Sequence, residues 1–197
     1  MTSLETALVE INGTLNRLHV SFALVGGLAV SVRTEPRFTR DADLAVALGT
    51  DKEAEALIHA LRAHGFLIAA VVEQEAVGRL ATVRLSLSSE PRAPVVDLLF
   101  ASSGIESEIV ADAEPIELLP KLTMSVARVG HLIAMKVLSR DDVRRPQDLV
   151  DLRGLLRVAE VDELARARHA LSLISARGYH RGRDLTSEMD RLVSPPA

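Results

Sequence analysis

Three aspartates stand at or inside runs whose pattern predicts buried strands. Asp41 and Asp43 open an apolar run that ends at Leu48, and alternation along a strand places both carboxylates on one face. Asp97 lies inside a second apolar run, 95–100, where an ionised carboxylate is costly to bury without a partner. Adjacent carboxylates repel each other unless they share a cation or a proton. Together they would suit Mg²⁺, and two ions about 3.5–4 Å apart could hold the attacking and leaving oxygens of a phosphoryl transfer.

Each of these carboxylates also has a simpler explanation. The first two could form a solvent-exposed strand end, and Asp97 could be satisfied by a core hydrogen bond or by an arginine. A pair of glycines adds to the functional interpretation. Gly26 and Gly27 follow the β-prone run 20–25 and precede a short helical stretch, so their backbone N–H groups could face a phosphate. A Gly-Gly pair after a strand is more often only a turn. Here it favours a phosphate site because it lies shortly before Asp41.

One lysine and two aspartates farther along the chain could complete such a site. Lys136 is surrounded by apolar residues within 133–138, so its ammonium needs a charged partner if it is buried. The alternative is a surface lysine whose stem lies along the helix. Asp148 and Asp151 are three residues apart and therefore share one helix face, which could equally be an exposed acidic face.

The elements that must position these residues follow from the spacing of apolar side chains. This spacing predicts helices over 4–18, 28–32, 50–64, 129–139, 146–157 and 162–177. It predicts strands over 20–25, 43–48, 66–72, 79–87 and 95–100, with a hairpin loop near 75–78. Capping boxes are expected at Thr2 with Glu5 and at Thr50 with Glu53, and Asp162 is expected to be an N-cap.

These elements define the fold class and the domains. We expect an α+β fold with a mixed β-sheet core flanked by helices and a C-terminal helical lobe. The core would span residues 1–120 and the lobe 121–197, with the last four residues frayed.

Composition and charge narrow the class of protein. A hydrophobic fraction of 48% is sufficient for a core, and the chain has no cysteine, which excludes disulfides and thiolate metal sites. No apolar run is long enough to span a membrane and no signal peptide is evident, so a cytoplasmic protein without a membrane partner is expected. Residues 41–125 hold 14 acidic and 6 basic side chains, whereas 126–183 hold 12 basic and 7 acidic. The first region favours metal binding and the second favours phosphates, unless the arginines are simply solvated.

At this point the motifs resemble a known superfamily. The runs 24–29 and 37–44 are similar to the first motif of DNA polymerase β-like nucleotidyltransferases. Arg37, then Thr39, then Asp41-Ala42-Asp43 resembles the AbiEii-type toxins, including their MenT-like branch. The narrower match is supported by the strand that holds Asp97, by the helix that holds Lys136 and by the helix 146–152. The chain departs from many relatives in having Gly26-Gly27 where they have Gly-Ser.

The resemblance implies roles for these residues. Asp41 and Asp43 would bind two Mg²⁺ ions, and Asp97 would bind the one that activates the acceptor hydroxyl. Lys136 would contact the triphosphate, and Asp151 would orient Lys136 or the acceptor, with Asp148 as the second choice. The substrate-binding set would comprise Gly26, Gly27, Arg37, Thr39, Lys136 and Asp148.

The resemblance also implies a function. The chain would transfer a nucleoside monophosphate from an NTP, with CTP or another pyrimidine triphosphate as a candidate, to the 3′ end of tRNA. It would be a toxin that blocks translation and has a cognate antitoxin. Two alternatives remain open: transfer to a small molecule or a protein, as in antibiotic modification, and a catalytically dead nucleotide-binding module. The dead module is disfavoured because all three carboxylates and the lysine are present.

Overall fold

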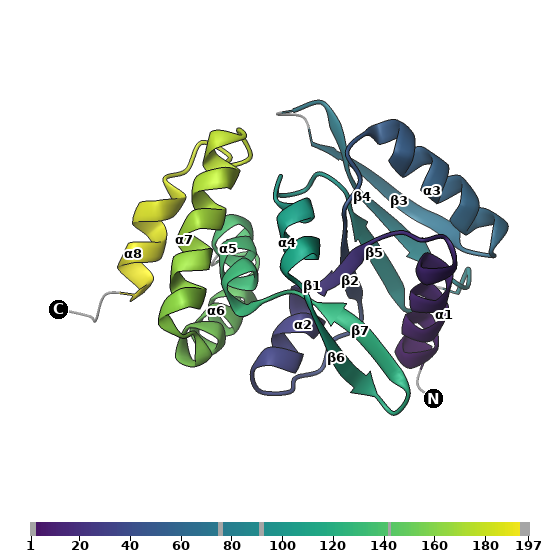
Figure 1. Cartoon of the computed structure of the whole chain (residues 1–197), viewed down its shortest axis with the longest axis horizontal. Coiled ribbons are helices and arrows are strands. Elements are labelled where there is room, and N and C mark those ends of the chain that lie inside the picture. Colours follow the sequence, from purple (N-terminus) through teal and green to yellow (C-terminus); the bar gives the residue numbers. More distant parts are fainter. Residues whose placement is uncertain (1–2, 75–76, 91–92, 142, 194–197) are drawn as a thin grey trace.

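One mixed β-sheet organises the chain, with the strand order β3-β4-β5-β2-β1-β7-β6. The structure is a computed structural model that describes residues 3–74, 77–90, 93–141 and 143–193 (Figure 1). The strands are β1 (Phe22–Val25), β2 (Ala42–Val46), β3 (Leu67–Gln74), β4 (Arg79–Ser86), β5 (Val95–Leu99), β6 (Glu114–Leu119) and β7 (Leu122–Val126). β2 pairs with β1 in antiparallel and with β5 in parallel orientation, and β1 pairs with β7 in parallel.

Helices pack on both sides of this sheet. They are α1 (Ser3–Arg17), α2 (Gly26–Arg33), α3 (Asp51–Ala63), α4 (Glu106–Asp112), α5 (Val129–Ser139), α6 (Pro146–Val158), α7 (Val161–Ala176) and α8 (Leu185–Val193). Figure 1 shows α1 and α3 on one side of the sheet, and α4 with the α5–α8 helices on the other. No helix within the described ranges is long and apolar enough to cross a membrane.

The core is built from aliphatic side chains at the expected periods. In α1 the buried residues are Ala7, Leu8, Ile11 and Leu15, which lie on one helical face. All of β1 is buried, as is β2 except for Asp43, because helices cover both faces of the central strands. The site aspartate therefore interrupts an otherwise buried strand in the middle of the sheet.

The helical lobe is attached to the sheet through α2. α5 packs against α7, α6, α8 and α2, and α2 also contacts β2 and α6. Gly130 in α5 allows close packing on α7, since a Cβ there would lie 2.4 Å from the Glu163 carbonyl oxygen. The arrangement brings α5 and α6, which hold the predicted lysine and aspartates, toward the same end of the sheet as the start of α2.

The predicted fold class is confirmed, and so are the predicted elements, most with shifts of one to a few residues at their ends. The capping box between Thr50 and Glu53 is present at the start of α3, and Pro146 is the first residue of α6. The N-cap predicted at Asp162 is wrong, because α7 already begins at Val161 with Glu160 as its N-cap. Thr2, part of the 75–78 loop and the tail 194–197 lie outside the described residues.

Four elements were not predicted: α4, β6, β7 and α8. The hairpin of β6 and β7 turns at Pro120 and Lys121, where Lys121 has a φ of 70°. Proline there marks a turn within the sheet rather than the end of the sheet region. The division at residue 120 stays a prediction, but the sheet itself continues to Val126, so that boundary falls within this hairpin.

Candidate active site

The parallel pairing of β2 with β5 places two of the predicted aspartates side by side. Asp43 and Asp97 are register partners on these strands, and Asp41 immediately precedes β2 and is exposed. Asp43 also lies opposite Val25, the last residue of β1, so it is close to the start of α2. The sheet therefore gathers the three carboxylates at the end where β2 and β5 begin.

The carboxyl group of Asp43 is held in an unfavourable environment for a negative charge. Burial raises the pKa of Asp43 to about 6, and repulsion from Asp97 and Asp41 adds to the rise, while Lys136 opposes it. A cation bound here would relieve this repulsion, so the electrostatics fit a metal ion. Within the described ranges, however, no three His, Asp or Glu side chains are grouped closely enough to form a metal site.

The raised pKa predicts a specific pH dependence of stability. Because the folded-state pKa of about 6 exceeds the ordinary value of 3.8, the folded chain binds more protons between these values than the unfolded chain. The stability contribution of Asp43 is therefore fully present below about pH 4 and is lost as pH rises through 6. We expect Asp43→Asn, in EDTA, to raise the free energy of unfolding at pH 7.5 by on the order of 2 kcal/mol and to change it little at pH 4.

Urea unfolding at the two pH values measures this difference. Glu55→Gln, which neutralises an exposed carboxylate on α3, is the control and should shift neither value by much. A gain from Asp43→Asn that is the same at both pH values would contradict the burial argument.

The two glycines form the first turn of α2 and lie against the site. Gly26 has a φ of 64°, and a Cβ there would lie 1.9 Å from Asp43 Oδ2. A Cβ on Gly27 would lie 2.7 Å from Arg37 Nη2 and 3.4 Å from Thr39 Cγ2. The helix begins two residues earlier than predicted, so the glycines belong to its N-terminal turn, whose N–H groups have no intrahelical acceptor. This turn can face an anion beside Asp43.

Asp97 has an arginine partner on the neighbouring strand β4. Arg84 on β4 is its register partner and donates two hydrogen bonds to it, from Nε to Oδ1 at 2.8 Å and from Nη2 to Oδ2 at 2.7 Å. An arginine partner was the simpler explanation for Asp97, and both carboxylate oxygens are engaged in it. Each oxygen accepts only one of these hydrogen bonds and keeps a second lone pair, so a metal ion bound by Asp97 would share that carboxylate with Arg84. Arg84 lies in the strand predicted over 79–87. Periodicity predicts such a strand but does not show with which strand, or with which residue, it pairs.

Lys136 is buried and lies between both predicted acids of α6. Its Nζ is 2.6 Å from Asp148 Oδ1 and 2.8 Å from Asp151 Oδ2. Lys136 is 8% exposed and each aspartate 3%, so the surface-lysine alternative does not apply. Asp148 also accepts from Ser139 and pairs with Arg145. Asp148 and Asp151 therefore hold the lysine together.

Arg37 connects this cluster to the segment before β2. Its Nε and Nη2 donate to the two oxygens of Asp151, at 2.9 and 2.8 Å. Burial alone would raise the pKa of Asp151, but the hydrogen bonds from Arg37, Gln147 and Lys136 outweigh it and leave that pKa below its usual range. Asp151 thus stays ionised and ties α6 to a residue 114 positions earlier in the chain.

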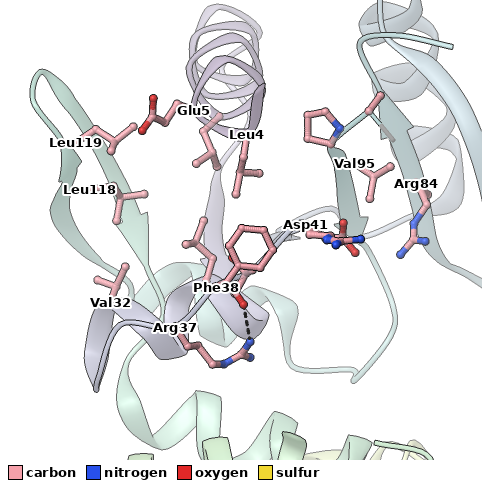
Figure 2. A pocket seen from close by; sticks show the side chains of 16 residues that line it. Leu4, Glu5, Val32, Arg37, Phe38, Asp41, Arg84, Val95, Leu118 and Leu119 are labelled. Atoms are coloured by element: carbon pink, nitrogen blue, oxygen red, sulfur yellow. Dashed lines mark hydrogen bonds between the residues drawn. The ribbon is translucent and has the colours of Figure 1, made fainter. Parts of the chain in front are cut away.

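The predicted residues therefore form one connected set. Arg37 touches the first turn of α2 and Asp151, Asp151 touches Lys136, and the charge of Lys136 acts on Asp43. Thr39 lies next to Gly27 and, with Arg37 and Asp41, lines a cavity beside the set (Figure 2). Carboxylates at one end of the central strands thus lie near a helix N-terminus and a buried ammonium, an arrangement suited to a polyphosphate.

This sheet topology and this site define a nucleotidyltransferase-like fold, and comparisons with known proteins give the family. The family model described as "Nucleotidyl transferase AbiEii toxin, Type IV TA system" matches residues 13–196. The chain belongs to this family and is a nucleotidyltransferase of the toxin class. Membership implies an NTP substrate and an antitoxin partner. A sequence comparison with curated proteins finds no significant match.

Solved structures support the fold. An antigenic nucleotidyltransferase-like protein from Paracoccidioides brasiliensis is similar with a TM-score of 0.56 and 19% identity, over 95% of this chain and 92% of that one. ANT(2″)-Ia in complex with adenylyl-2″-tobramycin is similar with a TM-score of 0.55 and 14% identity, over 89% and 99%. The toxin MenT4 from Mycobacterium tuberculosis also aligns, over 96% and 93% at 16% identity, but its TM-score of 0.34 supports no structural argument.

Proposed function

We propose that the chain transfers a nucleoside monophosphate from an NTP to the 3′ end of tRNA and thereby blocks translation. The observation that carries the transfer chemistry is the connected set of Asp41, Asp43, Lys136 and Asp151 at the start of α2. Membership of a toxin family supports the biological role. CTP or another pyrimidine triphosphate is the proposed donor.

In the proposed reaction, the acceptor hydroxyl oxygen bonds to the α-phosphorus and the bond from that phosphorus to the bridging oxygen breaks. Pyrophosphate leaves, and one of the carboxylates on the central strands accepts the hydroxyl proton. Lys136 and the N–H groups of Gly26 and Gly27 hold the negative charge of the leaving phosphates. Arg37 and Asp148 keep Asp151 and Lys136 in place, and Thr39 lies beside the phosphates.

Two Mg²⁺ ions are the proposed cofactors. Asp41 and Asp43 would hold them, and Asp97 would contribute an oxygen while it remains paired with Arg84. Bound there, the ions would lower the pKa of the acceptor hydroxyl and neutralise charge on the phosphates. The raised pKa of Asp43 is the feature of this chain that fits a cation at this place.

A direct experiment tests the proposal. The protein is incubated with each labelled NTP, Mg²⁺ and total RNA, and the products are separated by size. Label on tRNA with one preferred NTP is the expected result, and periodate-oxidised tRNA, which lacks a free 3′ hydroxyl, should gain none. A parallel incubation supplies cell extract freed of RNA in place of total RNA. Label on a small molecule or a protein there, with none on RNA, would support the second candidate function, and no label in either incubation would support the inactive module.

Binding of RNA should depend on salt and on α6. Arg153 and Arg157 are exposed on this helix and form no ion pair with other residues in the described ranges. Each phosphate contact made by an arginine releases counterions from the RNA, and this release favours binding. Arg153→Glu with Arg157→Glu removes two such contacts and should weaken tRNA binding about tenfold near 0.1 M salt. The slope of log K against log salt should fall by between about one and two, while NTP binding stays unchanged.

A charge-matched control lies on the opposite side of the sheet. Lys52→Glu with Arg62→Glu reverses two exposed cations of α3 and should affect tRNA binding much less. Equal losses in the two double variants would show that only net charge matters and would remove α6 from the proposed RNA surface. The measurement is fluorescence anisotropy of labelled tRNA at several salt concentrations.

A further inference from the structure

A large cavity opens beside Asp41. Its volume is about 950 Å³, within the range of pockets that bind organic ligands. Apolar side chains from α1, α2 and the β6–β7 hairpin form much of its lining, among them Leu8, Leu28, Val32 and Leu118. Figure 2 shows these elements around the cavity, with Phe38 in its midst.

Phe38 is an unusual residue for this position. Its side chain is 81% exposed, although it lies only three residues before Asp41. The Arg37 guanidinium donates to the Phe38 carbonyl at 3.4 Å, so the segment is held by the same arginine that binds Asp151. The Arg40 guanidinium carbon is 5.9 Å from the ring centroid. An exposed ring beside a cation, next to the reacting groups, can stack on a nucleobase.

Charged side chains of both signs line the cavity. The cations are Arg37, Arg40 and Arg84, and the anions are Glu5 and Asp41. Arg37 and Arg84 are already bound to aspartates, but Arg40 forms no ion pair with other residues of the described chain. A nucleotide in the cavity would place its phosphate near Arg40 and its base on Phe38.

The position of the cavity distinguishes the acceptor from the donor. Gly26, Lys136 and Asp148 are not among the described residues that line it, whereas Thr39 and Asp41 are. The proposed function places the triphosphate at Lys136 and the first turn of α2, with Thr39 and Asp41 at the border of the cavity. The cavity is therefore left for the molecule whose hydroxyl attacks.

We propose that this cavity takes an unpaired base at the end of a nucleic-acid acceptor, which stacks on Phe38 while Arg40 pairs with its phosphate. The inference rests on the proposed function, because it assigns the cavity to the acceptor of that reaction. In this proposal, Phe38 and Arg40 select an acceptor with a single-stranded end. They take no part in the chemical step.

The absence of tryptophan from the sequence gives a test that does not depend on activity. Phe38→Trp places a single indole in the cavity, and Val161→Trp places one at an exposed position on α7 as the matched control. In EDTA, a short single-stranded oligoribonucleotide should quench the fluorescence of Phe38→Trp in a saturable way and leave Val161→Trp unaffected. A blunt duplex of the same sequence should not quench either variant. Quenching by an NTP alone at lower concentration, or no saturable quenching by the oligonucleotide, would overturn the assignment.

Kinetics then separate this inference from the proposed function. Phe38→Ala should raise the KM for the RNA acceptor about tenfold or more, as expected for a lost stacked base, with the KM for NTP unchanged. If the wild type labels RNA and Phe38→Ala is indistinguishable from it, the cavity assignment is wrong and the transfer function stands. If the wild type labels no RNA but Phe38→Trp is quenched by the oligonucleotide, the transfer function is wrong and the binding assignment stands.

Discussion

Asp41→Asn is expected to reduce nucleotide transfer by about three orders of magnitude or more while the fold survives. Loss of a carboxylate from a metal site removes several kcal/mol of transition-state stabilisation, and each 1.36 kcal/mol is a factor of about ten in rate. Asp41 is exposed and forms no ion pair with another residue in the described ranges, so its neutralisation removes no packing contact. It even relieves part of the repulsion on Asp43.

Single-turnover transfer across a Mg²⁺ titration measures this effect, with melting temperatures as a second readout. In the wild type, Mg²⁺ should raise the melting temperature, because an ion that binds only the folded chain stabilises it. The rise should be much smaller in Asp41→Asn. Asp162→Asn, at the exposed start of α7, serves as the control and should behave like the wild type. Full transfer activity in Asp41→Asn would show that this residue is not a metal ligand.

Lys136→Ala is expected to lower turnover at saturating NTP by on the order of 10²-fold. The ammonium is buried and its charge reaches Asp43, so it can stabilise charge that moves toward the leaving pyrophosphate. The structure also predicts a cost in stability. Removal of Lys136 leaves two buried carboxylates without their shared cation, which costs on the order of 3 kcal/mol, reduced by the remaining contacts of Arg37 and Arg145.

A double variant separates the catalytic effect from this loss of stability. Lys136→Met together with Asp148→Asn removes the cation and one of its two anions, so it should melt closer to the wild type than Lys136→Ala. Its turnover should remain as low, because no cation faces the phosphates. Lys136→Arg should rescue poorly, since a guanidinium fork does not fit where a compact ammonium contacts two aspartates. Recovery of turnover in the double variant would mean that Lys136 acts only through folding.

Much of the site could be predicted from the sequence, because its signals are local. An aspartate within a β-prone apolar run, such as Asp97, and a lysine within an apolar helical run, such as Lys136, need partners wherever the chain folds. The helix α5 was predicted with the bounds it has, since its apolar residues leave few alternatives. The β6–β7 hairpin was missed because Pro120 looked like the end of the sheet region, whereas it lies in a tight turn.

Local patterns were enough to identify the aspartates and the lysine of this site and the kind of element on which each lies. Alternation and helical spacing are properties of neighbouring residues, so they can be read along the chain. The partners follow from the folded arrangement: Arg84 for Asp97, both Asp148 and Asp151 for Lys136, and Arg37 for Asp151 across 114 residues. Which charges meet depends on strand order and on how α6 packs against α5, and no local pattern encodes either. The cavity beside Asp41 has the same origin, because its walls come from helices and strands that meet only when the sheet is assembled.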